Sequence, residues 1–411
     1  MRHHGDNMAS VKKYNRSVIL QLLHQHGALS RKRISELMSL TPAAITMIVS
    51  EMIQDGLIVE GNAEKTGGFA GRKEIPVMLS ADSYIALGVS INLEELLLSA
   101  TNLNGVLLFS RAIPFENGIA PEQIVEMIAA NLPSLLAEHG IGSDKVMGIG
   151  VTVRGIVDMD TGFSVDSFGA LSKLNIPLKE MINQRISCPV SIDNNVRGLL
   201  RAHLFFSEQF ESGVFFVRCE KGIGAAILAD ARILNGASGM CSEFGHIPVV
   251  IRKGKPCKCG RAGCLETEAS PSAMVEEAKA VFSKEDTPYL WKLAKGKPAN
   301  ISLALVMQAA QEDAAVKRIV ETAAIYLANG IKGAICILDP SQVVLYGSVF
   351  ESEYYMQVLH AHLEDGFHTR LQTTTVIKSP FNLKLESTAA CVLAINAFFK
   401  SGGQISACAI G

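Results

Sequence analysis

Charged residues are scarce in this 411-residue chain, at 19% of the total, and no long low-complexity run occurs. Hydrophobic residues make up 48%, which is enough for a large core. This balance excludes a disordered chain and predicts two or three folded domains. We find no apolar run of the length of a membrane span, and no charged segment leading into an apolar one as in a secretory signal. We therefore expect a cytoplasmic protein with no membrane partner.

Cysteine is too sparse for a disulfide framework, with nine in the whole chain. Three of the nine, Cys257, Cys259 and Cys264, lie close together, which indicates metal binding in a cytosolic protein. The other six are scattered, mostly in apolar surroundings, and we expect them to be ordinary small core residues. These six are Cys188, Cys219, Cys241, Cys336, Cys391 and Cys408.

The net charge is only −2, but it is unevenly distributed. Residues 1–80 carry ten Lys or Arg against seven Asp or Glu, whereas the remainder carries 28 against 33. Residues 1–80, which we call the head, are mildly basic, and the remainder is acidic. This distribution is compatible with nucleic-acid binding at the head only.

The first part of the head shows two helical patterns. Apolar residues at helical spacing predict a helix over residues 12–26. Ser30 is expected to cap a second, shorter helix, with Ile34, Leu37 and Met38 facing inward.

A third helix and a β-hairpin follow. Thr41 fits the N-cap of this helix and Pro42 its first position. Residues 57–60 and 74–79 read as two strands around a polar, Gly-rich tip at 62–70. Three short helices followed by a hairpin are the order of a winged helix-turn-helix, in which the third helix enters the DNA major groove.

The exposed face of the third helix is small or polar, so it can approach base edges closely. Basic residues at the start of the second helix could contact DNA phosphates. A basic pair that follows the Gly-rich tip of the hairpin, the wing, could enter the minor groove. The predicted DNA-binding residues are Arg31, Lys32, Thr41, Ala43, Thr46, Met47, Ser50, Arg72 and Lys73. The alternative is a small helical cap that only mediates protein contacts.

A second group of residues indicates a metal site. Cys257, Cys259 and Cys264, with His246 eleven residues upstream of the first, supply a Cys3His set. Thiolates and imidazole suit zinc, and four protein ligands close the coordination shell, so we expect structural zinc. The alternative is a group of reduced surface cysteines without metal.

The same region resembles the signature of the ROK family (repressors, open reading frames and sugar kinases). The resemblance rests on Glu243-Phe244-Gly245-His246, on Cys257-Lys258-Cys259-Gly260 and on Gly263-Cys264-Leu265-Glu266. Weaker resemblance covers most of residues 81–402. With the winged helix in front, the chain is similar to the repressor branch, of the xylose, glucose and N-acetylglucosamine repressor type.

The resemblance implies an α/β, actin-like (ribonuclease H-like) ATPase fold with two lobes around a sugar cleft. Strand patterns at 146–153, 213–218 and 343–346 alternate with helical patterns at 122–138 and 313–332, as α/β layers require. The expected domains are the winged helix over 1–80, a first lobe over 81–196 completed by a C-terminal helix at 385–402, and a second lobe with the zinc loop over 197–384.

The resemblance also implies sugar-binding residues. In the family, the sugar is held by the Glu and His of the E-x-G-H motif, by the Glu after the last zinc cysteine, and by an Asn-Asp pair. The matching positions are Glu243, His246, Glu266, Asn194 and Asn195. We expect His246 to face zinc with one ring nitrogen and the sugar with the other. The alternative for both glutamates is a solvated loop carboxylate.

Three departures from the family's kinases argue against catalysis, so no catalytic residue is predicted. Asn195 stands where the kinases have an Asp as general base, and an amide cannot take a proton from a sugar hydroxyl. The first phosphate loop is replaced by residues 88–95, which end in two glutamates, and the second survives only partly at 220–224. The alternative is an active sugar kinase with a regulatory head.

One more departure affects the effector. Ala170 and Lys173 occupy places where the family often has Asn and Trp, so a usual sugar-contacting Asn is missing. Lys173 could meet an anionic sugar derivative or be a solvated lysine. The resemblance thus implies a homodimeric or homotetrameric repressor of carbohydrate genes. Its partners are double-stranded operator DNA and a sugar or sugar-derivative effector, or alternatively a phosphotransferase-system protein in place of the sugar.

Overall fold

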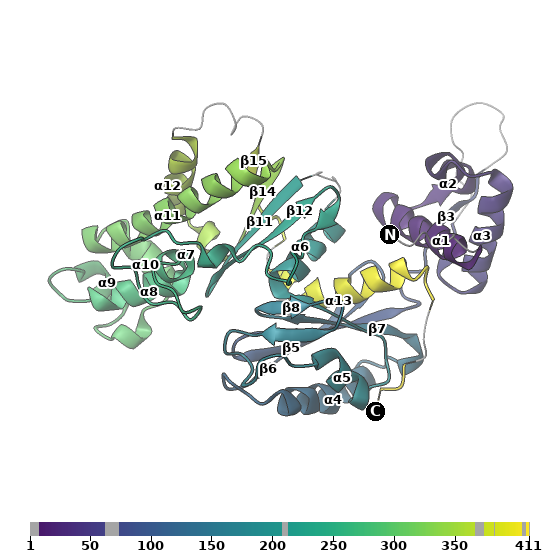
Figure 1. Cartoon of the computed structure of the whole chain (residues 1–411), viewed down its shortest axis with the longest axis horizontal. Coiled ribbons are helices and arrows are strands. Elements are labelled where there is room, and N and C mark those ends of the chain that lie inside the picture. Colours follow the sequence, from purple (N-terminus) through teal and green to yellow (C-terminus); the bar gives the residue numbers. More distant parts are fainter. Residues whose placement is uncertain are drawn as a thin grey trace. The chain divides into compact units, whose positions relative to one another are not determined.

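The computed structural model describes residues 8–61, 74–207, 213–365, 374–381, 383–404 and 408–410. The chain forms two compact units, one of Met1–Glu208 with Leu383–Gly411 and one of Gln209–Asn382 (Figure 1). The α/β class and the winged helix predicted from sequence are both present in this architecture.

The head begins the first unit. Its helices and strands are α1 (Met8–His26), β1 (Leu29–Ser30), α2 (Arg31–Met38), α3 (Pro42–Gln54), β2 (Ile58–Glu60) and β3 (Pro76–Leu79). The strands form one antiparallel sheet in the order β1-β3-β2. Both predicted caps are confirmed, because the hydroxyl of Ser30 accepts from the Arg33 amide and that of Thr41 from the Ala44 amide. Leu37 was predicted to face inward, but it is exposed on α2.

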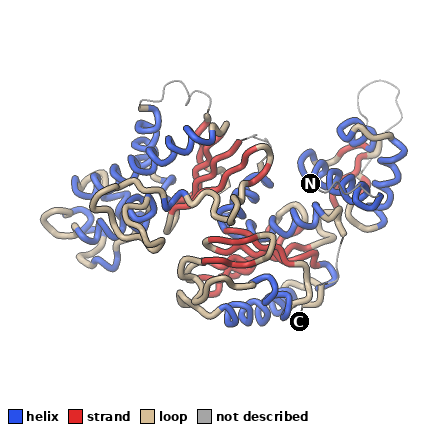
Figure 2. Tube along the Cα trace, in the orientation of Figure 1, coloured by secondary structure: helices blue, strands red, loops and turns tan. Residues whose placement is uncertain are grey.

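A five-stranded sheet forms the centre of the first unit, in the order β10-β7-β4-β5-β6. Figure 1 shows α4 and α5 on one face of this sheet and α13 on the other, and Figure 2 shows the strands as one layer between helices. The elements are β4 (Ile85–Ile91), β5 (Glu95–Asn102), β6 (Leu107–Pro114), α4 (Pro121–Glu138), η1 (Ser143–Lys145), β7 (Val146–Val153), β8 (Ile156–Asp158), β9 (Phe163–Asp166), α5 (Leu178–Arg185), β10 (Val190–Asn194), α6 (Asn195–Phe206) and α13 (Leu383–Lys400).

Small residues let α13 lie very close to the sheet. A Cβ on Gly150 of β7 would lie 1.8 Å from the carbonyl oxygen of Ala390, and one on Gly88 of β4 would lie 2.7 Å from Sγ of Cys391. Helix α6 packs beside α13, where a Cβ on Gly198 would lie 3.7 Å from Cβ of Ala389. Since α6 belongs to the first unit, the boundary that we predicted after residue 196 moves to residue 208.

The hydrophobic core of the head continues into α13. Ile19 and Leu20 of α1 belong to the same buried cluster as Ile395, Phe398 and Phe399 of α13. The head is therefore packed against the end of α13 as part of the first unit.

The second unit contains another five-stranded sheet, in the order β13-β12-β11-β14-β15. Its elements are β11 (Gly213–Cys219), β12 (Ile223–Ala229), β13 (Arg232–Ile233), η2 (Phe244–His246), α7 (Leu265–Ala269), α8 (Pro271–Ala280), α9 (Pro288–Leu293), η3 (Pro298–Asn300), α10 (Leu303–Ala309), α11 (Ala314–Leu338), β14 (Gln342–Tyr346), η4 (Ser348–Glu351), α12 (Glu353–Glu364) and β15 (Thr375–Lys378). The strands and helices predicted in this part are confirmed, with bounds that differ by up to six residues.

We predicted no segment with the length and apolar composition of a membrane span, but helix α11 has both. Among the described residues it is the one continuous helix long and apolar enough to cross a membrane by length and composition. It supplies buried residues such as Val320, Leu327 and Ile331 to the core of the second unit. The helix is apolar because it is the core helix of that unit.

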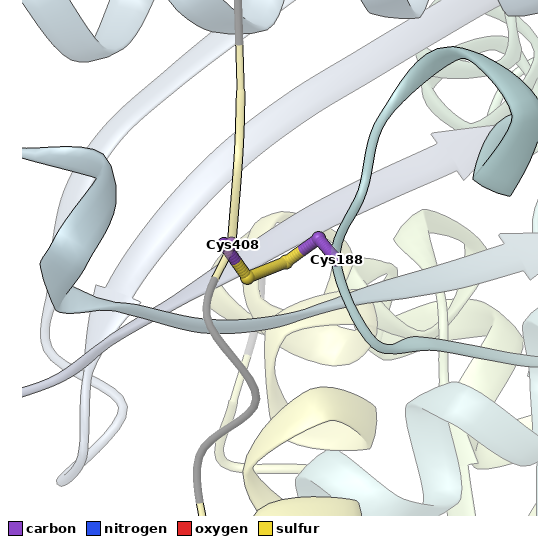
Figure 3. The surroundings of a disulfide bond; sticks show 2 residues. All are labelled: Cys188 and Cys408. Carbon is purple, nitrogen blue, oxygen red and sulfur yellow. A yellow bond between two sulfur atoms is a disulfide. The ribbon is translucent and has the colours of Figure 1, made fainter.

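The expectation that Cys188 and Cys408 are ordinary core residues is wrong. The two form a disulfide bond across 220 residues of sequence (Figure 3). Cys188 lies between α5 and β10, and Cys408 lies in the C-terminal segment that follows α13. The other predicted core cysteines are free, and of these Cys336 is exposed rather than buried.

Candidate functional site

The four predicted metal ligands are brought together in the second unit. One ligand atom from each of His246, Cys257, Cys259 and Cys264 lies within 4.8 Å of the others. Sγ of Cys257 is 3.4 Å from Nδ1 of His246, and Sγ of Cys259 is 3.6 Å from Sγ of Cys264. Three thiols and an imidazole in such a cluster can hold a metal ion.

Glycines allow the loop to fold tightly around these thiols. A Cβ on Gly254 would lie 2.3 Å from Cα of Gly263, so the two backbone segments touch. Gly263 has a φ of +73° and leaves no room for a Cβ beside the carbonyl oxygen of Val250. A hydrogen bond of 2.7 Å from the Cys257 amide to the Arg261 carbonyl then closes the turn that carries Cys259.

Arg261 also favours the thiolate form of Cys259. Burial opposes ionisation of this thiol, but hydrogen bonds from the backbone and side chain of Arg261 outweigh it, so the pKa falls to about 7. Burial, together with the neighbouring thiols, raises the pKa of Cys264 to about 12. A metal ion that bound at the cluster would displace a proton from Cys264, whereas Cys259 is readily ionised.

His246 connects the cluster to a predicted sugar-binding residue. Its Nδ1 faces Cys257, and its Nε2 lies 3.8 Å from Oε2 of Glu243. The two ring nitrogens thus point to different partners, and the cluster fixes the orientation of the ring toward Glu243.

Glu266 lies in the first turn of α7, two residues after Cys264. Its carboxylate accepts a hydrogen bond of 3.1 Å from the amide of Ile223, the first residue of β12. Its Cβ is 3.4 Å from where a Cβ on Gly245 would lie, so Glu266 is next to the E-x-G-H segment. Three of the five predicted sugar-binding residues therefore surround one loop of the second unit.

Asn194 and Asn195 lie in the first unit. Oδ1 of Asn194 caps α6 by accepting from the Val196 and Arg197 amides, and its Nδ2 donates to the Gly155 carbonyl at 2.6 Å. The Asn194 amide group is thus largely engaged by its own backbone surroundings. Asn195, at the first position of α6, is half-buried.

The sequence reasoning missed a buried charge cluster beneath these asparagines. Asp193 is fully buried and accepts from Nε of Arg197 at 2.6 Å and from Nε of Arg201 at 2.9 Å. Arg197 also donates to the carbonyl oxygen of Val157. The signal available in the sequence was that Arg197 and Arg201 follow Asp193 at four and eight residues. This cluster holds the start of α6 in place.

The two segments at the positions of the kinases' phosphate loops are turns that carry carboxylates. Residues 92–95 form the tight turn of the β4–β5 hairpin, in which the Asn92 amide donates to the Glu95 carbonyl. At the β11–β12 turn, the Glu220 carboxylate accepts from the amide and hydroxyl of Ser348, at 2.6 and 2.9 Å. A carboxylate therefore sits at each turn.

Lys173 is exposed and forms an ion pair with Glu122 at 2.5 Å. Ala170, three residues earlier, is fully buried. Of the two alternatives for Lys173, this arrangement supports the solvated lysine.

On the head, the predicted recognition surface of α3 is exposed. Ala43, Thr46, Met47 and Ser50 all face solvent, and Met47 is 62% exposed.

Two of the predicted basic residues of the head lie near carboxylates of the head. Arg31 forms an ion pair of 2.7 Å with Glu60, so DNA phosphates would compete with that carboxylate. Lys32, with 72% of its side chain exposed, lies 4.0 Å from Glu74. Arg72 and Lys73 lie outside the described residues.

Comparison with known proteins gives two family matches. The model of the ROK family matches residues 87–392, and that of the MarR family matches residues 14–59. A xylose repressor of Caldicellulosiruptor bescii is 24% identical over 385 residues, which cover 92% of each chain.

Two solved structures resemble the fold. A ROK family transcriptional regulator, described as a homologue of the E. coli MLC protein, has a TM-score of 0.80 and 23% identity and covers 96% of this chain and 98% of its own. A ROK family glucokinase from Streptomyces griseus, in complex with glucose and AMPPNP, has a TM-score of 0.64 and 23% identity and covers 76% and 98%. The kinase thus matches most of the chain, and the regulator matches nearly all of it.

Proposed function

The chain belongs to the ROK family, and from this premise we propose that it is a DNA-binding repressor of carbohydrate-utilisation genes. The observation that carries the proposal is the exposed α3 of a winged helix in the same chain as the sugar-kinase-like units. The similar xylose repressor matches 92% of the chain, which is more than the kinase-like part alone. We further propose that the protein acts in the cytoplasm, where it can reach an operator.

The head would read DNA through α3. The exposed side chains of α3 that would face the base edges are small, polar or apolar, and they are Ala43, Thr46, Met47 and Ser50. Thr41 and Lys32 are placed to contact the phosphate backbone of the DNA. One helix reads only one half-site, so we propose a homodimer, or a tetramer of such dimers, on a two-fold symmetric operator.

We propose that the kinase-like part binds a sugar through Glu243, His246, Glu266 and Asn195. Carboxylates accept from vicinal hydroxyls, and a site built for hydroxyl pairing discriminates strongly between sugars. The capping bonds of Asn194 support a role for it in fixing the start of α6, with one amide hydrogen left for a ligand.

The metal cluster is proposed to hold structural zinc. Zinc–sulfur bonds of about 2.3 Å in a tetrahedron place the ligand atoms about 3.5–3.8 Å apart. The separations of 3.4 and 3.6 Å fit this geometry. Four protein ligands leave no open position for a reacting water, so zinc would hold the loop and, through His246, orient Glu243.

We propose that no phosphate is transferred. Asn195 cannot serve as a general base, and the carboxylates of Glu94, Glu95 and Glu220 near the two turns would repel a nucleotide triphosphate. Next to the second turn, the carboxylate of Glu266 already accepts from the Ile223 amide, so that amide is engaged within the protein.

The test is fluorescence anisotropy with DNA from the flanks of the protein's own gene, at a fixed salt concentration, across a panel of sugars and sugar phosphates. Tight, sequence-specific binding weakened by one sugar is the expected result. Lack of specific binding to any flank, together with ATP-dependent phosphorylation of a sugar, would overturn the proposal in favour of a kinase with a regulatory head.

A second candidate is control by a protein partner instead of a sugar. The buried Ala170, at the position of a usual sugar-contacting Asn, favours it, because one hydrogen-bonding group of a sugar site is absent. Specific DNA binding that no sugar alters, but that a lysate fraction containing phosphotransferase-system proteins abolishes, would establish this alternative.

A further inference from the structure

A buried arginine joins the end of helix α3 to the end of α13. Arg16 of α1 is 7% exposed, and its Nε donates to the carbonyl oxygen of Gly402, two residues after α13, at 2.7 Å. Its Nη2 forms an ion pair of 2.7 Å with Oδ2 of Asp55, the residue at which α3 ends. One guanidinium thus holds an acceptor of the head and an acceptor of the turn after α13, and the carboxylate makes the first of these bonds a strong one.

The same end of α3 has a second link to the first lobe. The hydroxyl of Tyr84, one residue before β4, donates to the carbonyl oxygen of Asp55 at 2.7 Å. The centre of the Tyr84 ring lies 5.5 Å from that of Phe398 on α13. Asp55 is therefore held at its side chain by Arg16 and at its backbone by Tyr84.

The turn after α13 is shaped to receive the head. The amides of Gly402 and Gly403 donate to carbonyls in the last turn of α13, at 2.9 and 3.0 Å, and both glycines have a positive φ, of 72° and 73°. An added Cβ on Gly402 would lie 2.9 Å from the Lys13 carbonyl oxygen of α1. One on Gly403 would lie 2.5 Å from the side chain of Leu57. The head thus contacts the backbone of this turn, and no larger residue fits there without a shift.

The elements that carry this attachment are themselves fixed. Gly88 and Gly150 let α13 pack closely on the central sheet. In the short segment between β3 and β4, the Ser80 amide donates to the Leu57 carbonyl at 2.9 Å. The contacts from the sheet through α13 to α3 are therefore continuous, so packing as well as the linking segment orients α3 on the first lobe.

We propose that Arg16 is a positioning residue for DNA recognition, which fixes α3 on α13 and thereby sets the spacing of the two half-sites that a dimer can read. The proposal rests on the proposed function, in which two heads engage a two-fold symmetric operator. Half-sites one helical turn of DNA apart, about 34–36 Å, present the same face to the two heads. With both heads fixed on their lobes, an operator of another spacing leaves the second head misaligned.

Loss of Arg16 frees the orientation of the head but leaves its other contacts. The apolar cluster of α1 with α13 remains, and Asp55, with 51% of its side chain exposed, stays hydrated without its partner. A looser head has a lower effective concentration at the second half-site, but it reaches half-sites at other spacings. Affinity for the natural operator should therefore fall while tolerance of altered spacing rises. Damage to the fold of the head would instead weaken binding to every DNA alike.

The experiment measures fluorescence anisotropy of the full-length protein on three DNA duplexes at one salt concentration. The first duplex is the operator that footprinting of the wild type defines on DNA from the flanks of its own gene. The second carries one half-site only, and the third has two base pairs inserted between the half-sites. Arg16→Gln removes the guanidinium. Lys12→Gln is the matched control, because it removes an ion pair of 2.7 Å between α1 and Glu51 of α3, within the head.

The wild type should bind the operator with the insertion about tenfold or more weakly than the natural one. Arg16→Gln should bind the natural operator about three- to tenfold more weakly than the wild type, bind the single half-site within about twofold of it, and lose less than about threefold on the insertion. Lys12→Gln should keep the wild-type ratio between the two operators. A wild-type ratio in Arg16→Gln would overturn the proposal.

A second variant covers the case in which Arg16→Gln damages the head and weakens binding to all three duplexes equally. The double variant Asp55→Asn, Tyr84→Phe weakens the same attachment at positions that are not buried. It should also tolerate the insertion, and a wild-type ratio in it would overturn the proposal.

Hydrogen–deuterium exchange of residues 398–404 reports the attachment without DNA. It should be faster in Arg16→Gln than in the wild type and unchanged in Lys12→Gln. Unchanged exchange in Arg16→Gln would overturn the attachment. Faster exchange in a protein whose wild type binds no DNA specifically would support the attachment and count against the proposed function alone.

Discussion

His246 uses its two ring nitrogens for different tasks. Nδ1 belongs to the cluster with Cys257, Cys259 and Cys264, and Nε2 faces the carboxylate of Glu243. A metal at the cluster would therefore fix both the imidazole tautomer and the position of the carboxylate that we propose to bind sugar. Metal content and sugar response should depend on each other at this residue.

Replacement of Cys259 tests the metal directly. Cys259→Ser removes one thiolate ligand from the cluster, so zinc content should fall from about one per chain toward zero, and the second unit should lose about 3 kcal/mol or more of stability. Elemental analysis and thermal unfolding measure the two effects, with Cys336→Ser as the control. Unchanged zinc content and melting would contradict a structural metal.

His203 of α6 gives the first unit a pH-dependent stability. Burial lowers its pKa from 6.5 to about 4, so the folded state holds the neutral form. Below pH 6.5 the unfolded chain binds the proton more readily, and stability that is complete above pH 6.5 is lost as the pH falls toward about 4. The loss is at most about 3 kcal/mol, from about 1.4 kcal/mol per pKa unit.

Urea unfolding at pH 7.5 and pH 4.5 measures this effect. His203→Gln should show a smaller difference between the two pH values than the wild type. His26→Gln, which replaces an exposed histidine at the end of α1, should leave the difference unchanged. If His203→Gln retains the full pH dependence, another group is responsible.

At the scale of elements, α13 is held against the sheet by glycines. Gly150→Ala would place a methyl group 1.8 Å from the Ala390 carbonyl oxygen, so α13 would have to move. We expect a loss of about 2–3 kcal/mol, as for overpacked cores, measured by urea unfolding. Gly333→Ala, on the open face of α11, meets nothing within 4 Å and should be neutral or slightly stabilising. Equal effects of the two substitutions would refute the close-packing argument.

A charged substitution tests whether the exposed face of α3 contacts DNA. Ser50→Glu brings a carboxylate toward DNA phosphates without touching the core, so operator affinity should fall about tenfold or more while the melting temperature stays the same. Anisotropy and thermal unfolding measure the two effects. Ser172→Glu, at an exposed position of the first unit outside the head, is the control. Equal affinities of the two variants would remove α3 from the interface.

Elements that depend on local patterns were predicted well from the sequence. The caps at Ser30 and Thr41 and the strand over Val146–Val153 agree with the structure because each depends on residues a few positions apart. The grouping of His246 with the three cysteines was predictable for the same reason, since three of its four residues share one tight loop. The unit boundary was misplaced because α6 is assigned by its packing against α13, which follows it by almost 180 residues.

At the scale of the whole molecule, contacts between distant residues were beyond prediction. The Cys188–Cys408 bond spans 220 residues, and neither cysteine has a neighbour in sequence that signals a partner. The contact of Arg16 with Gly402 joins the two ends of the chain in the same way. The second of these contacts connects the head to the turn that follows α13.

The central claim is that one chain reads DNA and senses a sugar without transferring phosphate. The most direct test is an operator titration of the wild type and of Glu243→Gln, with and without each sugar of a panel. The wild type should lose affinity with one sugar, by about five- to 150-fold if the coupling is typical of allosteric proteins, and Glu243→Gln should bind DNA equally well but ignore that sugar. An operator affinity that no sugar changes, or a Glu243→Gln variant that responds like the wild type, would contradict the account.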